Sequence, residues 1–365
     1  MTSNSTGPIS GSATDTAQDA VNGTQGDAML DVKDLGVTFS LGGPPWNRRE
    51  LRAVKGVDMT LARGETLGLV GESGSGKSTT GRAILRLLPH TGQVTLDGTD
   101  VSKAGRGTLR GLRKRMQMVF QDPYSSLDPS MVVGESIAEP LRTHTSMGKD
   151  EREDEVKSLL EKVGLSPAHA SRYPYEFSGG QRQRVAIARA IALRPDLVVM
   201  DEAVSALDVS TQNQVINLVE DLRNEFNLAY LFIAHDLSVV RHISHRVAVM
   251  YLGEIVESGP TERLYRHPAH PYTEALLSAV PVPNPVLQRT RDRVILRGDL
   301  PDPSNPPAGC SFHTRCPYAM DICAVETPPT VAVQGGGETQ CHLHTSGPTL
   351  NGAPLESQEL ARASA

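Results

Sequence analysis

Short apolar runs separated by polar and glycine-rich turns recur along most of the chain. Runs at residues 66–70, 116–121, 197–200 and 230–234 have the length and composition of strands buried in a parallel sheet. Residues 29–38 alternate as a first strand does, and residues 93–96 form a further short β segment. From about 131 to 170 the apolar positions follow a helical spacing, as at Val156, Leu159, Leu160 and Val163. The pattern predicts an α/β fold.

The segment GESGSGKS, residues 71–78, lies between one of these strands and a helix-forming run at 79–88. Its glycines let several backbone N–H groups point inward, and the following helix adds its positive end, so the segment can hold a polyphosphate. Lys77 supplies a charge to the β- and γ-phosphates, and Ser78 offers a hydroxyl to Mg²⁺. The alternative is a glycine-rich turn that fits the pattern by chance, which the later motifs make improbable.

Polar side chains stand at the ends of three other predicted strands. Gln121 can reach a metal or an attacking water, and the Pro- and Ser-rich loop behind it can move. Asp201 and Glu202 follow one apolar run and point apart, which assigns Asp201 to Mg²⁺ and Glu202 to the water that attacks the γ-phosphate. His235 ends a further strand and can hydrogen-bond the γ-phosphate, although a single strand-end histidine is ordinarily structural.

A second glycine-rich helix start lies at Phe177 to Gln183, where Gly179 and Gly180 would form another anion-binding end. One chain with one phosphate loop has little use for two such ends. The economical explanation is that the second faces a nucleotide held by another copy or a paralogue. Near the N-terminus, Phe39 could stack on a base or serve as ordinary core, and Trp46 is a weaker candidate for the same contact.

Charge and hydropathy exclude several classes of protein. The net charge is −6 and the pI about 6.0, which gives no reason to expect nucleic acid as the main partner. No apolar run approaches the roughly 18 residues needed to cross a bilayer. Residues 1–28 contain no Lys or Arg and no apolar core, so they do not have the pattern of a signal peptide. We expect a protein that is cytosolic or held at a membrane by other chains.

All four cysteines lie in a distinct C-terminal stretch. Seven prolines between residues 281 and 307 mark a linker-like or tightly turned appendage, followed by Cys310, Cys316, Cys323 and Cys341. Four thiols within 32 residues can ligate one metal centre and so stabilise a short appendage with little apolar core. The spacings lack the C-x₂-C pairs typical of zinc ribbons, and four thiols also suit an iron–sulfur cluster or can remain free. The tails, residues 1–28 and 346–365, are expected to be disordered.

The ordered set GESGSGKS, VFQDP, FSGGQRQR, LVVMDE, SALD and His235 resembles the nucleotide-binding subunits of ATP-binding cassette (ABC) transporters over about residues 30–260. The resemblance implies a RecA-like core, an antiparallel β subdomain and a helical subdomain at about 122–190. It implies catalytic roles for Glu202, His235, Gln121 and Lys77, with Mg²⁺ held through Ser78, Gln121 and Asp201. The positions expected to contact ATP are Gly71, Glu72, Ser73, Gly74, Ser75, Gly76, Lys77, Ser78, Thr79, Phe39, Gln121 and Asp201, with Ser178, Gly179, Gly180, Gln181 (the signature motif) and Asp208 completing a partner's site. Phe177 replaces a common Leu and Ala203 a common Pro, and neither change removes a catalytic group.

Four further sequence segments resemble those of the ATPases of oligopeptide and dipeptide permeases. Such permeases usually carry two ATPase subunits, and this chain resembles the second of them. The four segments are GRAILRL at 81–87, RKRMQMVFQDP at 113–123, YLGEIVE at 251–257 and HPYTEALL at 270–277. This resemblance implies an ATPase domain at 29–279 and a permease-type C-terminal domain at 280–345 whose cysteines bind a [4Fe-4S] cluster or zinc. It also implies peptide import, with nickel or glutathione as alternative solutes.

The permease resemblance implies a set of partners and a location as well. The partners would be a second ATPase subunit, two membrane permease subunits and an extracytoplasmic solute-binding protein, at the cytoplasmic face of the cell membrane. A soluble ABC ATPase that acts on DNA or ribosomes would normally carry a coiled-coil insertion or two cassettes, and neither is visible in the sequence.

Overall fold

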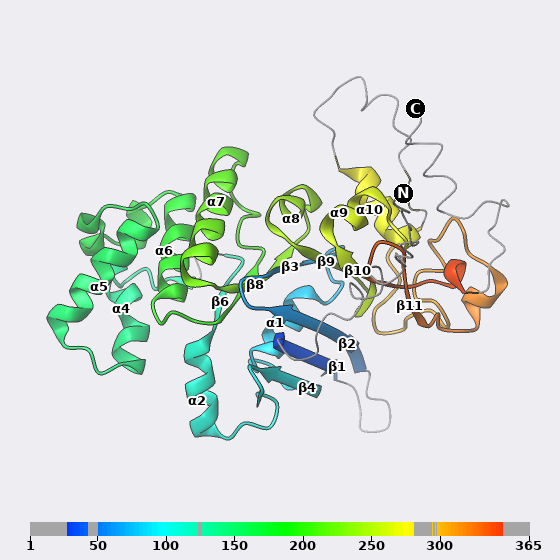
Figure 1. The fold of residues 1–365 in the computed structure, drawn as a ribbon, viewed down its shortest axis with the longest axis horizontal. Helices are drawn as coiled ribbons and strands as arrows, with labels where there is room; N and C mark the ends of the chain where they lie inside the picture. The colour runs from blue at the N-terminus through cyan, green and yellow to red at the C-terminus, as the bar shows by residue number, and fades with distance from the viewer. Residues whose placement is uncertain are drawn as a thin grey trace, which may run out of the picture.

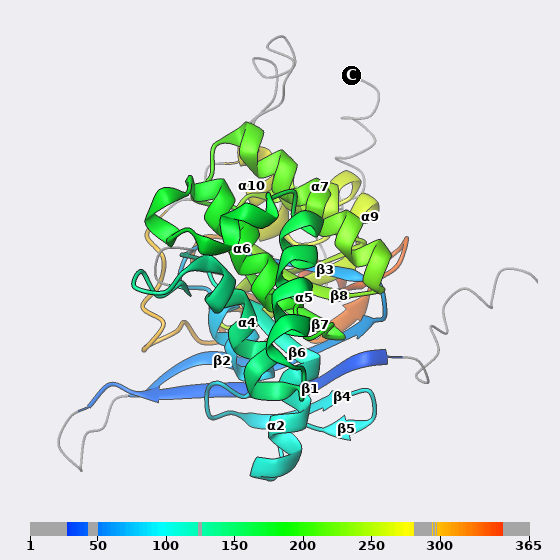
Figure 2. The ribbon, with the colours of Figure 1, turned by 90° about the vertical axis from the view of Figure 1, so that its left-hand side faces the viewer.

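The computed structural model describes residues 28–42, 50–122, 126–280, 294, 296 and 298–345. Several sequence predictions lie outside these ranges: the base contact of Trp46, the loop at 123–125, most of the proline-rich linker and both polar tails. Figures 1 and 2 show the described part from two directions at right angles.

Within the described ranges the strands form two sheets. The larger contains, in order across it, β11 (Thr330–Ala332), β12 (Glu338–Gln340), β10 (Glu254–Pro260), β9 (Arg246–Tyr251), β3 (Thr66–Val70), β8 (Ala229–Ala234), β7 (Leu197–Asp201) and β6 (Met116–Val119). The strands from β6 to β9 are parallel, and β10 turns back antiparallel to β9. The smaller sheet is antiparallel and contains β2 (Glu50–Ala62), β1 (Ala28–Ser40), β4 (Thr91–Leu96) and β5 (Thr99–Asp100).

The central strands are buried on both faces, as their continuous apolar runs predict. Along β7, Val198 and Met200 enter one core while Val199 enters the other, because successive strand residues point to opposite faces. The same alternation continues on β8, where Tyr230 and Leu231 lie in different cores. One core lies between the two sheets, and the other lies under the helices that cover the opposite face (Figure 1).

The helices divide by position. The described helices are α1 (Lys77–Ile84), α2 (Arg106–Arg115), α4 (Val133–His144), α5 (Lys149–Lys162), α6 (Gly179–Ile191), α7 (Val209–Phe226), α8 (Leu237–Ile243), α9 (Thr261–Arg266) and α10 (Pro271–Ala279). Short 3-10 turns lie at η1 (Pro167–Ser171), η2 (Pro174–Glu176), η3 (Asp321–Ala324) and η4 (His342–His344). Helices α4, α5 and α6 gather at one end of the large sheet, and α7 to α9 cover its face (Figure 1). The C-terminal segment lies at the other end.

The predicted α/β fold is confirmed, with differences at element ends. The strand expected at 116–121 ends at Val119, so Gln121 lies just beyond it. The helix expected at 79–88 is shorter and ends at Ile84. The C-terminal appendage is less separate than its composition suggested, because its β11–β12 hairpin pairs with β10 and extends the large sheet, with Glu257 opposite Thr339.

Candidate functional site

Four polar segments meet at one edge of the large sheet. The parallel strands β6, β7, β8 and β3 are direct neighbours in that order, so their carboxyl ends lie together. Gln121, Glu202 and His235 follow the first three strands, and the phosphate loop follows the fourth. Since ligands of open α/β sheets bind outside the carboxyl ends of strands, this edge is the candidate active site.

The phosphate loop needs glycine where its backbone comes close to neighbouring strands. Gly71 has φ 151° and Gly76 has φ 107°, both in the range that favours glycine. A Cβ atom on Gly76 would lie 2.3 Å from the Ala53 carbonyl oxygen, and one on Gly71 would lie 2.1 Å from that of Met250. Helix α1 begins directly after Gly76, so its free N–H groups face the loop.

The Lys77 side chain is almost fully buried and turned toward the loop. Its Nζ donates hydrogen bonds of 2.8 Å to the carbonyl oxygens of both Gly71 and Glu72. Burial lowers the pKa of Lys77, and the carboxylates of Glu202, Asp201 and Glu72 oppose that shift. The cation is thus held inside the loop by carbonyl dipoles, by the carboxylate of Glu72 in the loop and by those of Asp201 and Glu202 at the end of β7.

Ser78 and Asp201 form an oxygen pair across α1 and β7. The Ser78 hydroxyl donates to Asp201 Oδ1 at 2.6 Å, and Asp201 is fully buried at the end of β7. Arg82 Nη2 lies 3.5 Å from the other carboxylate oxygen. A hydroxyl and a carboxylate side by side are ligands of the kind Mg²⁺ takes at nucleotide sites.

Glu202 lies between the other two predicted polar groups. Its Oε2 accepts a 2.7 Å hydrogen bond from Gln121 Nε2 and lies 3.7 Å from His235 Nδ1. Glu202 has φ 47°, an uncommon left-handed conformation, and its backbone N–H donates to Ile233 O at 3.0 Å. The chain therefore turns sharply at the end of β7, and Asp201 and Glu202 contact different groups as the sequence predicted.

The glycine-rich signature segment begins α6. Ser178 is the N-cap: its hydroxyl accepts from Gln181 N at 3.3 Å, and its own N–H donates to Gln181 Oε1 at 3.0 Å. Asp208 caps α7 in the same manner by accepting from Thr211 N at 2.9 Å. Among the described residues, no hydrogen bond or ion pair joins residues 178–181 to the phosphate loop of the same chain.

Phe39 differs from its predicted setting. The sequence pattern ends the first strand at residue 38 and predicts Phe39 at the head of a glycine-rich loop, but Phe39 lies within β1, opposite Leu51 of β2. The β1 ladder continues to Ser40, so the strand extends past the point where its apolar alternation ends. The Phe39 side chain is exposed, and its contact with a base stays a prediction.

Comparison with known proteins gives two family matches. Residues 54–205 match the family described as ABC transporter, and residues 256–323 match the family described as oligopeptide/dipeptide transporter, C-terminal region. The chain is 50% identical to the oligopeptide transport ATP-binding protein AppF of Bacillus subtilis, over 87% of this chain and 98% of that protein. It is 51% identical to the oligopeptide transport ATP-binding protein OppF of Escherichia coli, over 82% of this chain and 92% of that protein.

This chain belongs to the ATP-binding subunits of ABC transporters, in the oligopeptide/dipeptide branch. A dimeric ATP-binding cassette solved with ADP and phosphate, MJ0796, superposes with a TM-score of 0.58 at 29% identity, over 64% of this chain and 99% of that one. The predicted family, cassette fold and ATPase activity are confirmed. As an ATP-binding subunit of this family, the chain is a peripheral component at the cytoplasmic face of the membrane. No helix in the described part of the chain is both long and apolar enough to span a bilayer.

Two residues that the sequence did not single out contact the phosphate loop of this ABC ATPase. The Glu72 N–H donates to Tyr272 Oη of α10 at 2.8 Å. The Glu72 carboxylate forms an ion pair with Arg315 of the C-terminal segment. Both contacts span 200 residues or more of chain, so no local pattern around Glu72 indicates them.

The four cysteines lie close enough to affect one another. All are free thiols, and Cys323 and Cys341 are buried. Burial raises the pKa of Cys310 to about 11 and of Cys316 to about 12, and the neighbouring thiols add to both shifts. In the described ranges, however, no three His, Cys, Asp or Glu side chains form a group that could hold a metal ion. The predicted metal site therefore finds no support in this geometry.

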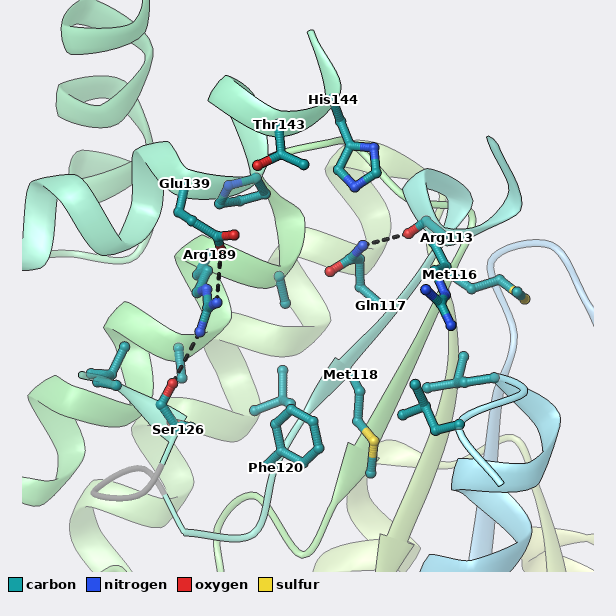
Figure 3. Close-up of a pocket in the computed structure, with 17 residues that line it drawn as sticks. Arg113, Met116, Gln117, Met118, Phe120, Ser126, Glu139, Thr143, His144 and Arg189 are labelled. Carbon is teal, nitrogen blue, oxygen red and sulfur yellow. Dashed lines mark hydrogen bonds and ion pairs between the residues drawn. The ribbon is translucent and has the colours of Figure 1, made fainter. Parts of the chain in front are cut away.

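A groove opens between the helical end of the ABC ATPase and β6 (Figure 3). Met118 and Phe120 line its sheet side, and α4 and α6 contribute Glu139 and Arg189. Arg189 Nη2 donates to Glu139 Oε2 at 2.8 Å and its Nη1 to Ser126 O at 3.0 Å. Phe120 directly precedes Gln121, so the groove adjoins the active site through one residue.

Proposed function

We propose that this subunit drives the import of peptides, as one of two ATPase subunits beside two permease subunits and an extracytoplasmic solute-binding protein. The observation that carries the proposal is the combination in one chain of a full set of catalytic side chains and a C-terminal region of the oligopeptide/dipeptide transporter type. The relatives named above support it, because they are oligopeptide transport proteins along nearly their whole length.

The separation of the signature segment from the phosphate loop supports a dimer. The N-terminus of α6 has an exposed Ser178 and a half-buried Gly179, and no described interaction links it to its own Lys77. A helix start of this kind suits a phosphate held by a second ATPase subunit. We infer two ATP sites, each built from the phosphate loop of one subunit and the signature segment of the other, with a paralogue as the second subunit.

The hydrogen bonds at the site support a separate role for each side chain. Ser78 and Asp201 would bind Mg²⁺, with Gln121 completing its coordination as closure of the site proceeds. Glu202 would accept a proton from the attacking water, and His235 would hydrogen-bond the γ-phosphate from the neighbouring strand. Lys77 would exchange its carbonyl partners for phosphate oxygens.

We propose that the groove beside β6 receives a segment of a membrane permease subunit. Its mixed lining of Met118 and Phe120 with a rim of Glu139 and Arg113 suits a short amphipathic element. Gln121 lies next to Phe120 and bonds Glu202. Movement of a docked segment against Phe120 would therefore shift Gln121 and its hydrogen bond to Glu202.

Uptake measurements test the solute. In cells that lack this chain, we expect uptake of labelled short peptides to be lost and to return with the wild-type chain but not with Lys77→Ala. Labelled nickel and glutathione serve as parallel substrates. If peptide uptake is unchanged while uptake of either alternative solute is lost, the peptide assignment is wrong but the ATPase assignment stands.

For the C-terminal segment we propose that the four cysteines bind an iron–sulfur cluster, with zinc as the alternative. The Cys310 N–H donates to Cys323 O at 2.8 Å, and Cys323 and Cys341 are both buried, which supports one shared centre. Such a cluster would tie the segment together and has no role in the steps above.

Anaerobic purification decides between these possibilities. We expect a broad visible absorption band, with about four irons per chain, that is lost in Cys316→Ser. If the protein is colourless and contains one zinc per chain, the four cysteines bind zinc and the cluster assignment is wrong. A metal-free protein would leave four structural thiols.

A further inference from the structure

The phosphate loop is held from outside the ATPase core by one side chain of the C-terminal segment. Arg315 Nη1 donates to Glu72 Oε2 at 2.8 Å and Arg315 Nη2 donates to Glu72 Oε1 at 3.1 Å. This is a two-pronged pair, the strong arrangement that guanidinium and carboxylate groups allow. The Arg315 side chain is only 9% exposed, so water screens the pair weakly.

Arg315 is rigidly presented. Its backbone N–H donates to Phe312 O at 3.0 Å, within a turn whose first residue, Cys310, donates to Cys323 O at 2.8 Å. The buried Phe312 ring packs edge-on against Tyr251, with centroids 5.2 Å apart. A second anchor joins Ser311 Oγ to Glu254 Oε2 at 2.9 Å. The turn is therefore fixed to β9 through Phe312 and to β10 through Ser311.

Glu72 is the point where this turn meets the ATP site. Its carbonyl oxygen accepts from Lys77 Nζ and its N–H donates to Tyr272 Oη, both at 2.8 Å. Its carboxylate acts on Lys77 directly, since it raises the pKa of that amine against the effect of burial. A negative side chain in a loop that binds polyphosphate opposes binding unless a cation neutralises it.

We propose that Arg315 is a positioning residue of the ATP site: it neutralises Glu72 and fixes the first turn of the phosphate loop. The C-terminal segment thereby completes a site that the cassette motifs alone leave with an unfavourable carboxylate. This inference rests on the ATP site proposed above, and it does not depend on whether the cysteines bind a metal.

The test measures ATP binding and turnover of the purified full chain. In Arg315→Ala the bare Glu72 carboxylate remains, and we expect Kd for a fluorescent ATP analogue and KM for ATP to rise about tenfold, equivalent to about 1.4 kcal/mol. The value of kcat should stay within about twofold, because Glu202 and its partners are untouched. Adding Glu72→Gln to Arg315→Ala should restore most of the affinity, since it removes the uncompensated charge.

Two controls make the result decisive. Arg241→Ala breaks an exposed pair with Glu262 and should leave Kd unchanged. Arg315→Lys keeps the charge but not the two-pronged geometry, and we expect its Kd for ATP to lie between those of the wild type and Arg315→Ala. This variant also tests the proposal if Arg315→Ala folds poorly. An affinity for ATP that is unchanged in Arg315→Ala, or equally weak with and without Glu72→Gln, overturns the proposal. Failure of the wild-type chain to bind ATP would instead reject the site itself.

Discussion

At the scale of single residues, the proposed roles of Asp201 and Glu202 depend on a turn at the end of β7. Asp201 completes the strand fully buried, while Glu202 adopts φ 47° and is half-buried beside Gln121 and His235. Such conformations cost energy and persist where surrounding contacts fix them. Here the N–H of Glu202 is tied to Ile233, and its carboxylate accepts from Gln121. The two adjacent carboxylates can therefore serve a metal and a water molecule separately.

The first prediction concerns Glu202→Gln. The amide keeps the shape of the side chain and its contact with Gln121 but cannot accept a proton from water. We expect ATP binding close to wild type and kcat reduced at least about 10²-fold, in line with loss of a general base. Asp201→Asn is the matched variant and should weaken Mg²⁺-dependent binding instead. Hydrolysis near the wild-type rate in Glu202→Gln would contradict the assignment of the base.

At the scale of elements, α10 connects the C-terminal segment to the phosphate loop. His270 caps the helix, and its Nδ1 accepts from Tyr272 N at 3.0 Å. Tyr272 in turn accepts the N–H of Glu72. His270 is buried, which lowers its pKa from 6.5 to about 3, with a smaller contribution from His344. The cap therefore requires the neutral imidazole.

This cap makes stability depend on pH. The unfolded chain takes up a proton on His270 below about pH 6.5, whereas the folded chain does not until about pH 3. Stability from this residue is full above pH 6.5 and falls as the pH decreases, by about 2 kcal/mol between pH 7 and pH 5. His270→Asn keeps a capping oxygen without titration. Urea unfolding at pH 7 and pH 5 measures this effect. The free energy of unfolding should fall less between the two pH values in His270→Asn than in the wild type, and an equal fall in both proteins would mean that the pKa of His270 is not lowered.

At the scale of the whole molecule, a buried ion pair joins the ATPase sheet to the C-terminal hairpin. Arg263 of α9 pairs with Glu257 of β10, both almost fully buried, and Arg263 Nε also donates to Gly336 O at 3.0 Å in the β11–β12 turn. Glu257 accepts from the N–H groups of Ala269 and His270 at 2.9 Å. One carboxylate thus links β10, the start of α10 and, through Arg263, the hairpin.

Removing one partner of this pair should destabilise the fold more than changing both partners. Arg263→Met leaves the Glu257 carboxylate buried and unpaired, and we expect a loss of about 3–5 kcal/mol in the free energy of unfolding. The double variant with Glu257→Gln should recover part of this loss. A chemical unfolding series on the three proteins measures both effects. A loss below about 1 kcal/mol in Arg263→Met would mean that the pair behaves like a surface salt bridge.

The nucleotide site could be predicted from the sequence, because its polar residues follow strand ends that local patterns reveal. GESGSGKS, Gln121, Asp201, Glu202 and His235 each follow an apolar run, and parallel strands bring such residues to one edge. Only the tertiary structure decided which strands are neighbours, that Phe39 lies inside β1, and that the cysteine segment extends the same sheet. It also decided the contact between Glu72 and Arg315, which are 243 residues apart. The physical reason is that hydrophobic periodicity specifies local conformation and burial, whereas contacts distant in sequence depend on how whole elements pack.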